Sequence, residues 1–387
     1  MSVAGNQQRT FLRLLAALRP HWHRDQNLPA RIQQLLARER SFGSRDRRLY
    51  RELIYTTLRH LPWIEPQLDT APDEAVRRVA WLAAETPATR AFRESFATGE
   101  APKGDRAELL PAWFREHCPE IFSGEELTAQ LRRAPLWIRV QRDSERVFAE
   151  FEQRGWKWSA TEATPHAFRV HDEVDLTKTE SFAAGNFEVQ DLGSQLVLEI
   201  ALNEPSGVWL DACAGAGGKT LQLAHLLGDR GRVEAYDVRT AALDELQRRA
   251  TRAALRNVSI RTEARLGTYD GVIVDAPCSG SGTWRRSPHL KWTTTSARIR
   301  EAAALQLTLL REHAARVAPG GRLIYATCSL SRRENEDVVA AFLAENPEFA
   351  TETPAKDLGF PLRGGGTTIW PSRWDTDGFF VAVFRRR

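Results

Sequence analysis

The sequence predicts a doubly wound α/β domain in the C-terminal half of the chain, preceded by a small α+β unit and an all-helical segment. Three changes of pattern along the 387 residues support this division. Residues 1–130 show the three- and four-residue apolar spacing of helices, residues 131–205 mix strand and helix patterns, and residues 206–387 alternate the two regularly. Regular alternation is typical of a parallel sheet with helices on both faces.

The N-terminal segment repeats apolar residues at helical spacing in FLRLLAALR, LPARIQQLLARE and GSRDRRLYRELIYTTLRHL. Ser44 is the predicted N-cap of the third helix, because its hydroxyl can accept a backbone N–H. The first 60 residues carry twelve arginines against four acidic residues, a net charge of +8. This excess favours an anionic partner such as nucleic acid, with a solvated arginine-rich helix face as the alternative.

The middle segment contains a few short elements of both kinds. PLWIRVQ and AFRVH are predicted strands, SERVFAEFEQRGWKW is a predicted amphipathic helix, and FEVQDLGSQLVLEIAL is a short extended piece followed by a helix. This mixture indicates one small α+β unit.

Six apolar segments of the C-terminal half are predicted strands: VWLDAC, RVEAYDV, VSIRTE, GVIVDAP, RLIYATC and GFFVAVF. Helix-like segments such as TLQLAHLL and TAALDELQRRATRAAL separate most of them, which predicts a parallel, doubly wound sheet. Ligands of such sheets bind beyond the carboxyl ends of the strands. Cys278 and Cys328 each follow a predicted strand, so we expect both thiols at this edge.

Composition limits the classes to which the chain can belong. No apolar run approaches the roughly 18 residues that span a bilayer, and the first ten residues lack a signal-peptide core, so we expect a cytoplasmic protein. The cysteines are too few for a disulfide framework and too far apart in sequence for paired metal ligands. Core packing and catalysis remain open to them: Cys118, Cys213, Cys278 and Cys328.

A glycine-rich turn, DACAGAGGKT, lies between the first strand of the C-terminal half and the next helix. Gly215, Gly217 and Gly218 let the backbone turn sharply and approach a ligand, and the helix N-terminus offers free N–H groups. Asp237 ends the following strand, where an acid accepts the ribose hydroxyls of a nucleoside cofactor. Together these features favour a nucleoside cofactor and leave NAD and S-adenosylmethionine equally open.

Two further motifs carry thiols. VDAPCSGSG places Asp275 and Cys278 after one strand, and LIYATCSLSRRENED places Cys328 after another. A thiolate at a ligand-binding edge is a candidate nucleophile. The segment TWRRSPHLKW follows the first motif and supplies candidate phosphate ligands and base-stacking groups: Arg285, Arg286, Lys291, Trp284 and Trp292.

Methylation of a pyrimidine at carbon 5 requires this set of groups. Carbon 5 is a poor nucleophile until a thiolate adds to carbon 6. An acid near N3 stabilises the proton that the ring gains, a base then removes the carbon 5 proton, and the thiol leaves. One thiol attacks and a second group assists release, but sequence spacing does not say which cysteine does which.

In order along the chain, DACAGAGGKT, VDAPCSGSG with RRSP, YATCS with ENED, and DGFF resemble the motifs of RNA cytosine-5 methyltransferases of the NOL/Sun type. SRDRRLYRELIYTTLRH resembles the NusB-like domain fused to that core, and LPAWF, PLWIRV and VQDLGSQ resemble its middle region. The resemblance implies a NusB-like helical RNA-binding domain at 1–130, a small α+β RNA-binding unit at 131–205, and a Rossmann-like methyltransferase domain at 206–387.

The resemblance also implies roles for individual residues. Cys328 would be the nucleophile, Cys278 would assist product release, and Asp275 would lie between cofactor and base, near N3. S-adenosylmethionine would bind to the first loop and to acids at neighbouring strand ends: Cys213, Ala214, Gly215, Ala216, Gly217, Gly218, Lys219, Asp237, Glu263 and Asp275.

The sequence departs from the family pattern at five places, one of which is a short connection from TEAR to YDGVIVDAP. Gly215-Ala216 replaces Ala-Pro in the first loop, and TEAR replaces a Gly-Asp-Gly, which leaves Glu263 as the candidate for the adenine side. His289 replaces the usual Asp after RRSP, and Gln141 replaces an Asn in the middle region. None of these changes affects the two edge cysteines, so we expect an active enzyme.

We therefore expect a monomeric, metal-free enzyme that transfers a methyl group from S-adenosylmethionine to carbon 5 of a cytidine in RNA, most simply 16S rRNA. A tRNA substrate and a non-catalytic RNA-binding protein are the alternatives. The latter has no use for Asp275, Cys278 and Cys328 at one edge. An NAD(P)-dependent oxidoreductase leaves both thiols unexplained, and a DNA cytosine-5 methyltransferase does not need Cys328.

Overall fold

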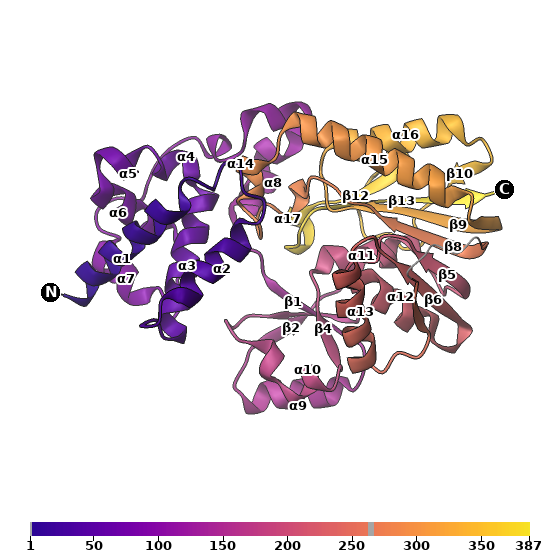
Figure 1. Cartoon of the computed structure of the whole chain (residues 1–387), viewed down its shortest axis with the longest axis horizontal. Helices are drawn as coiled ribbons and strands as arrows, with labels where there is room; N and C mark the ends of the chain where they lie inside the picture. Colours follow the sequence, from indigo (N-terminus) through magenta and orange to yellow (C-terminus); the bar gives the residue numbers. More distant parts are fainter. Residues whose placement is uncertain (1, 262–266) are drawn as a thin grey trace. The chain divides into compact units, whose positions relative to one another are not determined.

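The computed structural model describes residues 2–261 and 267–387, which form two compact units (Figure 1). Unit 1 comprises Met1–Arg133 and Trp284–Thr295, and unit 2 comprises Ala134–Thr283 and Ser296–Arg387. Segment 284–295 thus belongs to a different unit from its neighbours in sequence. Within the described residues, every helix is too short or too polar to span a bilayer.

Unit 1 is helical, as the apolar spacing predicts. Helix α1 buries Phe11, Leu14, Leu15 and Leu18 on one face, and these side chains form one core with the buried residues of the other long helices. The α-helices are α1 (Val3–Leu18), α2 (Leu28–Arg38), α3 (Ser44–Arg59), α4 (Leu61–Ile64), α5 (Gln67–Thr70), α6 (Pro72–Leu82), α7 (Arg90–Phe96), α8 (Gly124–Leu131) and α14 (Leu290–Thr293). Three short 3-10 helices, Arg106–Leu109, Ala112–Glu116 and Pro119–Phe122, lie between α7 and α8.

The start of α3 differs by one residue from the prediction. Ser44 is the first helical residue, and Gly43 takes the N-cap position instead. The carboxylate of Asp46 accepts the Gly43 N–H at 3.0 Å. An acid in the first turn therefore does the capping that the Ser44 hydroxyl was expected to do, and it also favours the positive end of the helix dipole.

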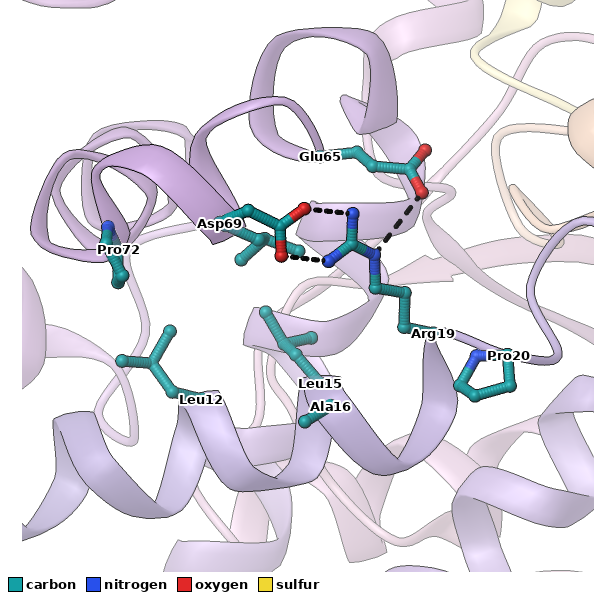
Figure 2. A pocket seen from close by; sticks show the side chains of 9 residues that line it. Leu12, Leu15, Ala16, Arg19, Pro20, Glu65, Asp69 and Pro72 are labelled. Atoms are coloured by element: carbon teal, nitrogen blue, oxygen red, sulfur yellow. Dashed lines mark hydrogen bonds and ion pairs between the residues drawn. The ribbon is translucent and has the colours of Figure 1, made fainter.

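A pocket of about 640 Å³ opens on unit 1 (Figure 2). The Arg19 guanidinium closes one side by binding both carboxylate oxygens of Asp69, at 2.6 and 2.7 Å, and lies 3.7 Å from Glu65. The rest of the lining is apolar, and the polar groups already bind one another. The lining residues are Leu12, Leu15, Ala16, Arg19, Pro20, Glu65, Leu68, Asp69 and Pro72.

Unit 2 begins with a small antiparallel sheet, in the order β2-β3-β1-β4. Helix α9 (Ser144–Gln153) buries Val147 and Phe151 in a core that also contains Ile138 and Phe187 from the strands. The predicted α+β pattern of this region is confirmed. The other elements are β1 (Leu136–Val140), β2 (Trp158–Ala160), β3 (Ala167–Val170), the 3-10 helix Leu176–Lys178, α10 (Glu180–Ala183) and β4 (Phe187–Val189).

The larger sheet contains nine described strands in the order β11-β12-β13-β9-β8-β5-β6-β7, with β10 paired to β13. Strands β5 to β9 are parallel to one another. The chain order reverses between β5 and β8, which makes their carboxyl ends the expected ligand site. The strands are β5 (Gly207–Asp211), β6 (Gly231–Tyr236), β7 (Val258–Arg261), β8 (Tyr269–Asp275), β9 (Val317–Thr327), β10 (Phe349–Thr351), β11 (Leu362–Arg363), β12 (Gly366–Ile369) and β13 (Phe379–Arg386).

Helices cover both faces of this sheet. Trp209 of β5 packs in the core that includes α11 (Leu192–Ala201) and α12 (Gly218–Leu227), whereas the next residue, Leu210, packs in the core of α15 (Ser296–Ala314) and α16 (Glu336–Glu345). Successive strand residues point to opposite faces, so burial on both sides explains the continuous apolar runs. Figure 1 shows α15 and α16 on one side, and α11, α12 and α13 (Thr240–Arg252) on the other.

The pairing direction of the last predicted strand differs from the prediction. GFFVAVF forms β13, but this strand pairs antiparallel with β9 rather than extending the parallel sheet. It also pairs antiparallel with β12, and only the short α17 (Pro371–Trp374) lies between the two. A parallel connection needs a crossover of about a dozen residues or more, and the nine residues 370–378 are too few.

Candidate active site

The glycine-rich turn connects β5 to α12 at the switch point of the sheet. Gly215 and Gly217 have φ values of 53° and 90°, a region that L side chains rarely adopt. A Cβ on Gly217 would lie 2.7 Å from Leu246 Cγ, so close packing also requires glycine there. Ala216 stands in the place of the family's proline, and its carbonyl accepts a hydrogen bond from Arg249 at 2.7 Å.

Asp237 follows β6 and ties this turn to the next strand. One carboxylate oxygen accepts the Gly215 N–H at 2.8 Å, and the other accepts the Arg239 backbone N–H and Nε, both at 2.9 Å. Burial acts to raise the pKa of Asp237, but these hydrogen bonds outweigh it and lower the pKa. A ribose would share this ionised carboxylate with Arg239, whose side chain is 69% exposed.

Cys213 lies at the start of the turn, directly after Asp211 and Ala212. Burial, followed by the charges of Asp211, Asp275 and Asp237, raises the pKa of the Cys213 thiol. Burial also raises the pKa of Asp211 to about 7. Thr220 donates a hydrogen bond to Asp211 Oδ2 at 2.7 Å, while Oδ1 is buried and has no hydrogen-bond partner among the described residues.

Asp275 ends β8 and is held by the first helix of the site. Lys219 Nζ, on α12, lies 2.8 Å from Asp275 Oδ2. The lysine side chain is 6% exposed, whereas that of Asp275 is 31% exposed. The ammonium also lies 5.1 Å from the centre of the Phe379 ring, a cation–π contact. The pair fixes the Asp275 carboxylate while leaving part of it open to a ligand.

The two edge cysteines meet. Cys278 Sγ and Cys328 Sγ lie 3.2 Å apart, at hydrogen-bond distance, and both are free thiols. Their loops follow the neighbouring parallel strands β8 and β9, in which Asp275 pairs with Ala326. The hydrogen bond to Cys328, followed by burial, raises the pKa of Cys278. The sequence-based placement of both thiols at one edge is therefore confirmed.

The burial of segment 284–295 contradicts the prediction that its cations and indoles contact RNA. Trp284 and Arg285 are 0% exposed and Lys291 is 1% exposed, all within unit 1. Lys291 Nζ donates to the carbonyls of Arg59 and Leu109 at 2.7 and 3.0 Å. The Trp292 indole N–H donates to the Leu58 carbonyl at 2.7 Å. Lys291 and Trp292 thus pair with backbone acceptors of the helical unit instead of phosphates or bases, and only Arg286 of the five residues is exposed.

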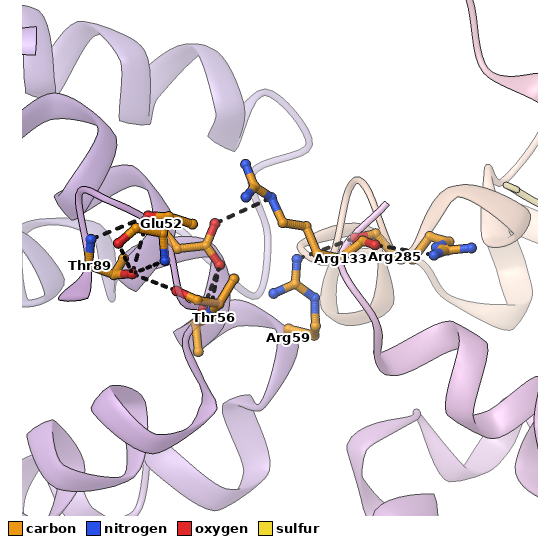
Figure 3. A network of polar contacts seen from close by, with 8 residues as sticks. Glu52, Thr56, Arg59, Thr89, Arg133 and Arg285 are labelled. Atoms are coloured by element: carbon orange, nitrogen blue, oxygen red, sulfur yellow. Dashed lines mark hydrogen bonds and ion pairs between the residues drawn. The ribbon is translucent and has the colours of Figure 1, made fainter. Parts of the chain in front are cut away.

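The buried arginines belong to a polar network in unit 1 (Figure 3). Arg59 Nη2 donates to the Arg285 carbonyl at 3.4 Å, and Arg285 Nη2 donates to the Arg133 carbonyl at 3.2 Å. Arg133 lies 3.6 Å from Glu52, which also accepts a hydrogen bond from Thr56. Burial lowers the pKa of Arg59, because desolvation disfavours the guanidinium charge.

Comparison with known proteins identifies the family. Residues 197–385 match the family model described as 16S rRNA methyltransferase RsmB/F. The chain spans only about half of two curated relatives. These are "Probable ribosomal RNA small subunit methyltransferase B" of Bacillus subtilis, 34% identical over 56% of this chain and 53% of the relative, and the protein of that name from Synechocystis, 33% identical over 59% and 54%. "Ribosomal RNA small subunit methyltransferase B" of Xanthomonas campestris is 30% identical over 76% of this chain and 69% of its own length.

The chain belongs to the RsmB/F family of 16S rRNA methyltransferases. Solved structures agree on the fold. The crystal structure of PH0851 is 24% identical and superposes with a TM-score of 0.75 over 100% of both chains. NSun6 from Pyrococcus horikoshii with SFG is 19% identical and has a TM-score of 0.64 over 74% of this chain and 98% of its own. The Rossmann-like methyltransferase fold is thereby established.

S-adenosylmethionine is the cofactor of the RsmB/F family, and the residues of the turn fit it. The positive φ values at Gly215 and Gly217 bring bare backbone to the head of α12. Among the described residues the buried Asp211 Oδ1 has no hydrogen-bond partner, which suits the ammonium of the cofactor's amino-acid part. The charges of Asp211, Asp275 and Asp237, which all act on the Cys213 thiol, suit a molecule that carries a positive sulfonium.

Sequence reasoning missed some groups at the site and left one untested. It gave no role to Asp211 or Glu334, although both lie within the quoted motifs. Glu263 lies outside the described residues, so its adenine contact stays a prediction.

The two remaining departures from the family pattern are structural in this chain. His289 is buried in unit 1, and its Nε2 lies 3.2 Å from the Gln26 carbonyl. Gln141 donates to the Gly185 carbonyl at 2.8 Å. Both side chains thus bind backbone carbonyls within their own units.

Proposed function

We propose that this protein transfers a methyl group from S-adenosylmethionine to carbon 5 of a cytidine in 16S rRNA, through a covalent bond between Cys328 and carbon 6. The observation that carries the proposal is the pair of thiols 3.2 Å apart at the carboxyl ends of β8 and β9. Family membership supports rRNA as the substrate class. The bound cofactor supplies an electrophilic methyl group at this edge.

We divide the work between the thiols by the resemblance to the NOL/Sun enzymes, in which the thiol of the Thr-Cys motif is the nucleophile. Cys328 is therefore assigned the attack on carbon 6. Attack forms the sulfur–carbon 6 bond and makes carbon 5 nucleophilic. Asp275, held by Lys219 at 2.8 Å, is placed to stabilise the proton that the ring gains near N3.

Release reverses the addition after carbon 5 has received the methyl group. A base takes the carbon 5 proton, the carbon 5–carbon 6 double bond re-forms, and the Cys328 sulfur leaves carbon 6. Cys278 lies at hydrogen-bond distance from that sulfur. A thiol in this position can assist departure through its proton, which is the role we assign to Cys278.

The target base has to leave its stack to reach two thiols at a sheet edge. We assign RNA binding to the helical residues 1–130, as a NusB-like domain, and to the small sheet of residues 131–205. The exposed arginines Arg38, Arg40, Arg45 and Arg48, at the end of α2 and the start of α3, support this assignment. Their charge favours the phosphate backbone without reading sequence.

The test is incubation of the purified protein with rRNA and methyl-labelled S-adenosylmethionine, followed by mapping of 5-methylcytosine. We expect Cys328→Ala to abolish turnover and Cys278→Ala to accumulate a covalent RNA–protein adduct. Cys118→Ala, which removes a buried thiol of unit 1, is the matched control and should keep turnover. Full turnover by Cys328→Ala would show that the nucleophile is wrongly assigned, and label in tRNA alone would replace the substrate.

A further inference from the structure

The two thiols lie on separate loops beyond the last paired residues of β8 and β9. The ladder between these strands ends with Asp275 opposite Ala326, before either cysteine. Beyond that pair, Ala276 N–H donates to the Ala326 carbonyl at 2.9 Å and Gly282 N–H donates to the Cys328 carbonyl at 2.9 Å. A thiol-to-thiol distance of 3.2 Å needs further restraint, because loop backbone is otherwise free to separate.

One buried carboxylate joins the loops. Glu334 is 0% exposed, and its Oε1 accepts the Ser279 backbone N–H at 2.7 Å. Its Oε2 accepts the hydroxyls of Ser279 and Ser329, both at 2.5 Å. Ser279 directly follows Cys278, and Ser329 directly follows Cys328. The same side chain therefore holds the residue next to each thiol.

A second layer fixes this carboxylate. Gln306, on α15, donates to the Pro277 carbonyl at 2.9 Å and to Glu334 Oε1 at 3.1 Å. The Tyr325 hydroxyl lies 3.0 Å from Gln306 Oε1 and 2.5 Å from the Glu334 carbonyl oxygen, so its single proton can be donated to either acceptor. Gln306 and Tyr325 lie on a helix and a strand of the sheet core, so rigid elements position the clamp.

We propose that Glu334 is a positioning residue that clamps the Cys278 and Cys328 loops together and so sets the distance between the two thiols. This inference rests on the proposed function, since it assigns a role within that reaction. A carboxylate suits the task because its two oxygens accept up to about four hydrogen bonds, and Glu334 receives four. The reach of the side chain is what the clamp requires.

Two replacements separate reach from charge. Glu334→Gln keeps the length, and its amide can accept from the Ser279 N–H on one side and donate to the two rotatable hydroxyls on the other. Glu334→Asp keeps the charge but is one methylene shorter, so it cannot hold both loops at once. A clamp predicts that Gln works and Asp fails.

The first readout needs no RNA and no turnover. Mild oxidation of the purified protein should close a disulfide between the adjacent thiols, followed by peptide mass mapping. We expect Glu334→Gln to match the wild-type rate of closure and Glu334→Asp to be slower by about tenfold, because separated loops place the sulfurs out of reach. Equal rates in all three proteins would overturn the clamp, even if the enzyme methylates RNA as proposed.

The second readout is single-turnover methylation. A displacement of about 1 Å can reduce a rate by about 100-fold, and we expect that scale of loss for Glu334→Asp with little change for Glu334→Gln. Cofactor affinity should stay at the wild-type value in both, which shows that the variants are folded. Loss in Gln with activity kept in Asp would make the carboxylate charge essential and overturn the positioning role.

A second route covers a failure of Glu334→Asp to fold. The double variant Ser279→Ala, Ser329→Ala removes both hydroxyl donors, two of the four donors to Glu334, while leaving the carboxylate in place. It should slow disulfide closure and methylation together. Unchanged closure in this variant would also count against the clamp. If Glu334→Asp slows disulfide closure relative to the wild type but the wild-type protein methylates no RNA, the proposed function fails and the clamp stands.

Discussion

Two basic segments of this chain lie in opposite environments, one exposed to solvent and the other largely buried. Residues 38–48 carry five arginines, and Arg38, Arg40, Arg45 and Arg48 are exposed on unit 1. Residues 284–295 carry Arg285, Arg286 and Lys291 and no acid, yet two of these three cations are buried in the same unit. Charge alone favours RNA for both segments, and the structure supports it for one.

The difference lies in the large apolar side chains that flank the cations in the sequence. Trp284 packs against Phe114 with ring centres 4.6 Å apart, and Trp292 packs on the helical core. Burying these rings takes the neighbouring backbone inside, and the cations follow. Lys291 is tolerated there because it donates to two carbonyls. Aromatic interleaving, which suggested base stacking, here indicates a packed core.

The largest expected effect comes from removing the ring that buries the second segment. Trp284→Ala should lower the free energy of unfolding of unit 1 by about 4 kcal/mol, since it leaves a cavity beside Phe114. Thermal and urea unfolding followed by circular dichroism measure it. Trp113→Ala, at a partly buried position in the same unit, is the control and should cost less. Equal losses would mean that segment 284–295 is not a core element.

A smaller effect should appear as a pH dependence of the free energy of unfolding that arises from His60, a buried histidine of unit 1. Burial, and then the charge of Arg59, lowers the pKa of His60 from 6.5 to about 3. Between these values the unfolded chain binds a proton that the folded chain does not, so stability is full above pH 6.5 and falls as the pH drops toward 3. The loss attributable to His60 is about 3 kcal/mol at pH 4.

His60→Asn tests this contribution, because its amide can still donate to the Thr56 carbonyl that His60 Nδ1 contacts at 3.0 Å. Unfolding measured from pH 8 to pH 4 should show a shallower decline in the variant than in the wild type. Other buried histidines contribute equally to both proteins and cancel in the difference. Parallel pH curves would exclude His60 as the source.

The exposed segment should instead govern RNA binding. The slope of log affinity against log salt concentration is negative. Replacing Arg38, Arg40 and Arg45 by alanine should make it shallower by about 2, at about 0.7 for each lost contact with single-stranded RNA. The free energy of unfolding should change by less than about 0.5 kcal/mol for each exposed site. Filter binding at several salt concentrations measures the slope.

A matched triple variant in unit 2 controls for loss of charge itself. Arg230→Ala, Arg248→Ala and Arg256→Ala remove three exposed arginines of the other unit. We expect a smaller change of slope for this variant. Equal slopes for the two triple variants would show that RNA binding is spread over the surface and that the exposed segment has no special part in it.

The smallest expected effect tests whether the energetic cost of removing a cation depends on the burial of its side chain or on the segment in which it lies. Arg286 is exposed although it lies in the buried segment. Arg286→Ala should change the free energy of unfolding by less than about 0.5 kcal/mol. Arg285→Ala, at a neighbour that is 0% exposed, is the comparison and should cost clearly more. Similar costs at both positions would contradict the contrast between buried and exposed cations.

The sequence was sufficient for the parallel strands and for the edge that carries the site. Apolar runs mark buried strands, and parallel strands place their carboxyl ends together, so Asp275, Cys278 and Cys328 could be brought to one edge without coordinates. The same runs carry no sign of direction, which is why β13 was expected to be parallel. Pairing direction depends on the length and path of the connection.

Long-range partners explain the remaining misses. Lys291 is buried by the carbonyls of Arg59 and Leu109, which lie more than 180 residues earlier in the sequence. Glu334 acquires its role from Ser279, which is 55 residues away. No local pattern records such pairings, whereas the glycine-rich turn around Gly215 and Gly217 is local, so its spacing could indicate a nucleoside cofactor while leaving NAD and S-adenosylmethionine equally open.

Unit 1 is assembled from two stretches of sequence, so the chain crosses between units after Arg133, after Thr283 and again after Thr295. A cut at residue 133 would therefore not yield a self-contained catalytic fragment. The C-terminal product would expose the apolar side chains of Trp284 and Trp292 to water, which favours aggregation. The N-terminal product would contain a cavity where Trp284 packs against Phe114. Separate expression of the two units therefore requires that segment 284–295 be joined to the helices of unit 1, and that a polar linker replace it in the C-terminal fragment.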